Sequence, residues 1–83
     1  MRQQVKDAVI VVDLHGKNVY QSRICLESAL RRAGGAYRIR IIHGHNCGTA
    51  LRELVRGEFS LDSRVIRAIN VNESITELVL REL

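Results

Sequence analysis

Residues 38–59 read RIRIIHGHNCGTALRELVRGEF, and three patterns follow one another in this segment. The first part alternates arginine with isoleucine, which is the period-two pattern of a strand. The last part spaces its apolar side chains as one face of a helix does, at Leu51, Leu54, Val55 and Phe59. Glycines and histidines lie between the two parts, without a bulky apolar side chain. The segment therefore predicts a strand, a glycine-containing loop and a helix.

The loop is a candidate anion site. Backbone N–H groups at a helix N-terminus are free to bind an anion, which the helix dipole also favours, and phosphate is the natural ligand. A glycine loop alone is a weak signal. We expect phosphate contacts from the loop, from the start of the helix and from arginines on the helix and the strand, namely Gly44, His45, Asn46, Gly48, Thr49, Arg52, Arg38 and Arg40.

A second segment near the start of the chain repeats the arrangement. Residues 9–12 form an apolar run of strand length, followed by Asp13-Leu14-His15-Gly16 and a helical pattern that begins at Asn18. If the two strands are parallel neighbours, Asp13, His15 and His43 converge at the carboxyl edge of the sheet. Open α/β sheets usually place their ligands at that edge.

The whole chain is expected to form one domain, residues 1–83, with residues 1–7 frayed. Strands are predicted near residues 8–14, 37–42, 64–71 and 75–81, and helices near residues 18–33 and 49–59. Right-handed crossovers place both helices on one face of the sheet. The predicted fold is therefore an α/β (α+β) two-layer sandwich, β-α-β-α-β-β, with a four-stranded mixed sheet whose open face carries Arg38 and Arg40.

Asp13, His15 and His43 are the candidate catalytic residues. Cleavage of RNA without a metal needs a base and an acid, and histidine can supply both near neutral pH. An aspartate can fix the tautomer of a neighbouring histidine. The simpler alternative is that these side chains only bond backbone amides at the strand ends. The string His43, His45 and Cys47 could bind zinc, but we expect no metal and no other cofactor.

The two motifs together resemble those of the Smr (small MutS-related) domain family, over residues 9–83. The resemblance rests on residues 13–16 after an apolar strand and on Ile-Ile-His-Gly at 41–44, which precedes a loop and Ala-Leu-Arg-Glu at 50–53. It implies a fold similar to the C-terminal domain of bacterial translation initiation factor three, and endonuclease activity on nucleic acid. The sequence departs from the family at Asn46, where the family motif has glycine, and at residues 70–74, which replace a glycine-rich hairpin. A non-catalytic nucleic-acid or nucleotide binding module is therefore the alternative.

Charge and composition agree with a nucleic-acid partner. The formal net charge is +4, which suits a polyanion. No apolar run approaches the roughly 20 residues of a membrane-spanning helix, and residues 1–4 lack the apolar core of a signal peptide. We therefore expect a cytoplasmic protein without a membrane partner, present as a monomer or as a weak homodimer through an exposed strand edge.

Overall fold

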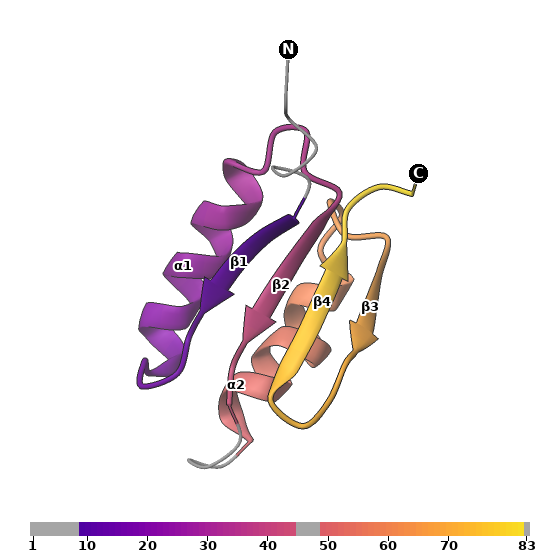
Figure 1. The fold of residues 1–83 in the computed structure, drawn as a ribbon. Helices are drawn as coiled ribbons and strands as arrows, with labels where there is room; N and C mark the ends of the chain where they lie inside the picture. Colours follow the sequence, from indigo (N-terminus) through magenta and orange to yellow (C-terminus); the bar gives the residue numbers. More distant parts are fainter. Residues whose placement is uncertain (1–8, 45–48, 83) are drawn as a thin grey trace.

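The computed structural model describes residues 9–44 and 49–82. Four strands form one sheet in the order β1-β2-β4-β3, and two helices accompany it (Figure 1). The elements are β1 (Val9–Asp13), α1 (Val19–Arg31), β2 (Arg38–Ile42), α2 (Ala50–Glu53), β3 (Arg67–Asn70) and β4 (Ile75–Val79). The chain order β-α-β-α-β-β is the predicted one. In the described ranges, no helix is both long enough and apolar enough to cross a membrane.

The sheet is mixed, as predicted. β1 and β2 are parallel neighbours, whereas β4 is antiparallel to both β2 and β3. The register sets Asp13 beside Ile42, so the carboxyl ends of β1 and β2 lie at the same edge. The outer edge of β1 pairs with no other strand in the described part of the chain.

The core lies between the sheet and both helices, which confirms that the helices share one face. Ile39 and Ile41 are buried and belong to one apolar cluster with side chains from both helical regions and from β4, including Leu26, Leu54 and Leu78. Burying each such side chain contributes about 1.5–3 kcal/mol. Since side chains alternate along a strand, the arginines between these isoleucines project from the open face of the sheet.

Helix α1 begins and faces the core largely as the sequence predicts. The Asn18 side chain accepts a hydrogen bond from the Gln21 backbone N–H, and the Gln21 side chain accepts one from the Asn18 backbone N–H, at 2.7 and 3.0 Å. This reciprocal pair is a capping box. The core face of α1 consists of four buried residues, Ser22, Leu26, Ala29 and Leu30, whereas Val19 in the first turn is 36% exposed.

The second helix and the third strand differ from prediction. The expected helix remains α-helical only from Ala50 to Glu53, then widens into a π-helical segment (Leu54–Glu58) and ends in a 3-10 turn (Phe59–Leu61). The strand expected at residues 64–71 is shorter because a turn occupies residues 62–65. In that turn, the Asp62 carboxylate accepts a hydrogen bond from the Arg64 backbone N–H at 2.9 Å.

Candidate functional site

Asp13 and His15 form an exposed pair at the carboxyl end of β1. Leu14 between them is buried, and its N–H donates to the Ile42 carbonyl at 2.8 Å, which holds the backbone against β2. His15 Nδ1 lies 2.7 Å from Asp13 Oδ1, and the His15 backbone N–H donates to the same oxygen at 3.1 Å. These two hydrogen bonds, the side-chain one first, lower the pKa of Asp13, so the carboxylate is ionised at neutral pH.

The pair leaves one histidine nitrogen available. Because an ionised carboxylate only accepts hydrogen bonds, Nδ1 of His15 carries the shared proton, and Nε2 has no hydrogen-bond partner among the described residues. His15 also lines an open depression of about 500 Å³, together with Gly16, Lys17, Gln21, Ile24 and Cys25. An imidazole with a carboxylate on Nδ1 is suited to accept a proton at Nε2.

His43 lies at the same edge but is buried, with 4% of its surface exposed. Its Nδ1 is 3.0 Å from the Gly44 carbonyl oxygen, and its Nε2 is 2.9 Å from the Thr76 hydroxyl oxygen. Burial lowers the pKa of His43, and the positive charges of Arg56 and Arg52 lower it further. The structure therefore brings Asp13 and His15 into contact with each other and places the His43 side chain in the interior.

Gly44 follows His43 in the chain and lies next to His15 in space. Its φ of 73° is in the left-handed region, where glycine is favoured. A Cβ atom at this position would lie 3.9 Å from the Cβ of His15. The backbone N–H groups of His43 and Gly44 both donate to the Ser74 carbonyl, at 2.9 and 3.1 Å. The turn between β3 and β4 thus fixes the backbone at the start of the glycine loop. His15 lies next to this backbone at Gly44.

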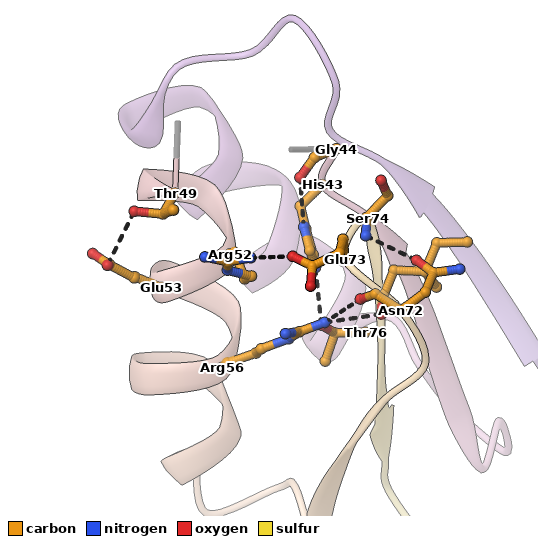
Figure 2. Close-up of polar contacts among 11 residues, drawn as sticks. His43, Gly44, Thr49, Arg52, Glu53, Arg56, Asn72, Glu73, Ser74 and Thr76 are labelled. Atoms are coloured by element: carbon orange, nitrogen blue, oxygen red, sulfur yellow. Dashed lines mark hydrogen bonds and ion pairs between the residues drawn. The ribbon is translucent and has the colours of Figure 1, made fainter. Parts of the chain in front are cut away.

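Arg56 and Thr76 complete a polar cluster around His43, as Figure 2 shows. Arg56 Nε donates to the Thr76 hydroxyl oxygen at 2.6 Å, and Arg56 Nη2 donates to the carbonyl of Asn72 at 2.5 Å and to that of Ile75 at 3.3 Å. Neither Arg56 nor Thr76 is among the site residues predicted from the sequence. The position of Thr76 in strand β4, on the core face beside Ile41, is the signal that could have identified it.

The predicted phosphate contacts next to the loop have acidic partners. Arg52 Nη1 lies 2.7 Å from Glu73 Oε1, and the Thr49 hydroxyl donates to Glu53 at 3.1 Å instead of capping the helix backbone (Figure 2). Glu73 is 76% exposed, so its carboxylate can be displaced by a ligand. Three other predicted contacts, His45, Asn46 and Gly48, lie outside the described residues.

Arg38 and Arg40 project from the open face of the sheet, as predicted, and share a carboxylate that the sequence analysis missed. Glu77 is buried between them, with Oε1 2.8 Å from Arg38 Nη1 and Oε2 3.0 Å from Arg40 Nε. One negative charge thus offsets part of the charge of the two guanidinium groups. Among residues 9–44 and 49–82, no group of three or more histidine, cysteine or acidic side chains is placed so that it could hold a metal ion.

The architecture defines a class: a small α+β sandwich with a polar site at the carboxyl edge of two parallel strands. Comparison with solved structures identifies the fold. The chain is similar to the crystal structure of the Smr domain of Thermus thermophilus MutS2, with 29% sequence identity, a TM-score of 0.77, and coverage of 88% of this chain and 99% of that chain. No family model and no curated protein matches the chain. The chain therefore has the Smr-domain fold, which confirms the resemblance drawn from its two motifs.

Proposed function

We propose that this chain is a nucleic-acid-binding domain that cleaves a phosphodiester bond at the Asp13–His15 pair. The hydrogen bond of 2.7 Å between the two side chains carries the proposal, because it orients an exposed imidazole whose Nε2 bonds none of the residues that the structure describes. The likeness to an Smr domain supports binding of nucleic acid. Lys17 and Arg52 flank that edge and supply positive charge for a phosphate backbone.

On RNA, the reaction would proceed by attack of the neighbouring 2′-hydroxyl. Nε2 of His15 takes the hydroxyl proton, the 2′-oxygen forms a bond to phosphorus, and the bond from phosphorus to the 5′-oxygen breaks. Asp13 stabilises the imidazolium that forms. The leaving oxygen takes a proton from water, and the hydroxide left behind accepts the proton from His15. The products are a 2′,3′-cyclic phosphate and a 5′-hydroxyl, and no redox or metal step is involved.

A binding module that does not cleave is the second candidate. Its support is that both ring nitrogens of His43 are bonded within the protein, so that His15 is the one exposed histidine in the part of the chain that the structure describes. Asn46, in place of the family's glycine, also favours this candidate. In this case the same edge binds the phosphate backbone of the nucleic acid, and Asp13 orients His15 so that its ring contacts that backbone.

Incubation of the pure protein with labelled RNA and DNA, with and without a chelator, separates these functions. We expect cleavage that survives the chelator, and losses of roughly 10²–10⁴-fold in Asp13→Ala and His15→Ala with most of the binding retained. Glu82→Gln, an exposed charge change remote from the edge, is the control. An inert wild type that still binds establishes the binding module. A protein that binds neither nucleic acid at low salt would refute both.

A further inference from the structure

We infer that His43 is a positioning residue: Arg56 and Thr76 hold its ring in one tautomer behind Gly44, and proton transfer is left to His15. The inference rests on the proposed function and refines it, because the sequence pattern alone placed both histidines in the chemistry. The residues involved come from three segments that the fold brings together, namely the π-helical segment, strand β4 and the end of β2 (Figure 2).

With a neutral imidazole, the hydrogen bonds of this cluster have only one consistent direction. The carbonyl oxygen of Gly44 can only accept, so Nδ1 of His43 carries a hydrogen and Nε2 has the lone pair. The hydroxyl hydrogen of Thr76 then points to Nε2. The guanidinium of Arg56 can only donate, and the lone pairs of the hydroxyl oxygen receive its Nε–H. The series of hydrogen bonds therefore runs from Arg56 through Thr76 and His43 to Gly44, and each of these polar groups has a partner.

The same cluster is a poor place for an additional proton. The ring is buried, and the guanidinium that bonds Thr76 lies just beyond the hydroxyl, so a second positive charge would be both desolvated and repelled. These effects, burial first, lower the pKa of His43 and keep it neutral near pH 7. A neutral ring with both nitrogens engaged cannot donate to a leaving oxygen from this position.

The cluster of His43, Arg56 and Thr76 positions the backbone next to His15. Arg56 also holds the carbonyls of Asn72 and Ile75, and the same turn, through the Ser74 carbonyl, receives the N–H groups of His43 and Gly44. Gly44 in turn adjoins the His15 side chain. The π-helical segment contributes directly, since it contains Arg56, and wide helical turns are frequent at functional sites.

Nuclear magnetic resonance of ¹⁵N-labelled protein tests the tautomer without reference to activity. We expect His43 to show a protonated Nδ1 and an unprotonated Nε2, unchanged from about pH 7 to pH 8. Thr76→Val removes the hydroxyl that bonds Nε2, so it should shift the His43, Gly44 and His15 signals. Thr76→Ser keeps the hydroxyl and should restore them. A protonated Nε2, or titration of His43 within this range, would overturn the inference.

Kinetics give the second measurement. His43→Asn keeps an N–H donor for the Gly44 carbonyl, so cleavage should fall by roughly tenfold at most, with the shape of the pH–rate profile preserved, whereas His15→Asn should lose about 10²–10⁴-fold. Thr76→Val should lower kcat by up to about 100-fold without changing that shape. A changed shape of the profile in His43→Asn would refute the inference. If the wild type does not cleave, the proposed function fails, and the tautomer and the Thr76→Val shifts still decide the role of His43.

Discussion

Replacing Glu73 with glutamine should tighten the binding of nucleic acid. The Glu73 carboxylate occupies Arg52 at 2.7 Å, at the point where a phosphate is expected to bind. Before the guanidinium can bind a phosphate oxygen, the carboxylate must leave, and afterwards its negative charge remains beside the phosphate. Glutamine keeps the size of the side chain and removes the charge that competes.

The size of the effect follows from exposure and distance. Glu73 is 76% and Arg52 28% exposed, so the ion pair to be broken is worth about 0.2–1 kcal/mol. A carboxylate and a phosphate about 6–8 Å apart in water repel by roughly 0.5–0.7 kcal/mol, and salt reduces this value. Before screening by salt, these terms together predict an affinity about three- to sixteenfold higher, since 1.4 kcal/mol is a factor of ten.

Fluorescence anisotropy with a labelled oligonucleotide, at about 50 to 200 mM salt, measures the change. The matched control is Glu82→Gln, which makes the same change in net charge and breaks a similar exposed pair, with Arg67 at 3.0 Å, at the opposite end of strand β4. In an Arg52→Ala background the Glu73→Gln gain should largely disappear. Equal effects of Glu73→Gln and Glu82→Gln, or no gain at low salt, would refute the placement of phosphate at Arg52.

Three further substitutions test the fold. Gly57→Ala should raise the free energy of unfolding by about 0.5–1 kcal/mol in urea titrations, because a Cβ there meets no atom within 4 Å in a helical position. Arg64 lowers the pKa of Asp62 to about 2, so this pair stabilises the fold above pH ~4 and its contribution is lost as the pH falls toward 2. Asp62→Asn should therefore reduce stability at pH 7 and flatten its acid dependence in urea midpoints. Leu78→Ala, at a fully buried position, should cost about 2–5 kcal/mol and lower the thermal midpoint.

The fold could be predicted because its signals are local. The alternation of arginine and isoleucine at residues 38–41 assigns each face of β2. Asn18 and Gln21 mark the start of α1 through a contact three residues apart. The handedness of crossover connections then leaves few topologies for two strand–loop–helix units. The predicted proximity of Asp13 and His15 is also local, since the two residues belong to one strand end.

The partners of the charged residues could not be predicted in the same way. Glu77 is 37 positions from Arg40 in the sequence, and Thr76 is 33 from His43, so both contacts depend on the register between β2 and β4. The orientation of His43, by contrast, could have been predicted from the sequence. Extending the alternation two positions past Ile41 places it on the core side of the sheet, where burial favours a neutral ring. The roles expected for His45, Asn46 and Gly48 stay predictions.

The sheet order bears on how the protein folds as it is synthesised. β4 is made after the other three strands of this sheet, and it lies between β2 and β3. Until residue 79 has left the ribosome, β2 has an unpaired edge, the core lacks Leu78, and Arg38 and Arg40 lack their shared carboxylate. The domain therefore cannot close progressively from its N-terminus, and folding waits for a late contact between distant parts of the chain. In that interval the nascent chain exposes an edge that another copy can pair with, so slow translation of the segment that contains β4 favours aggregation.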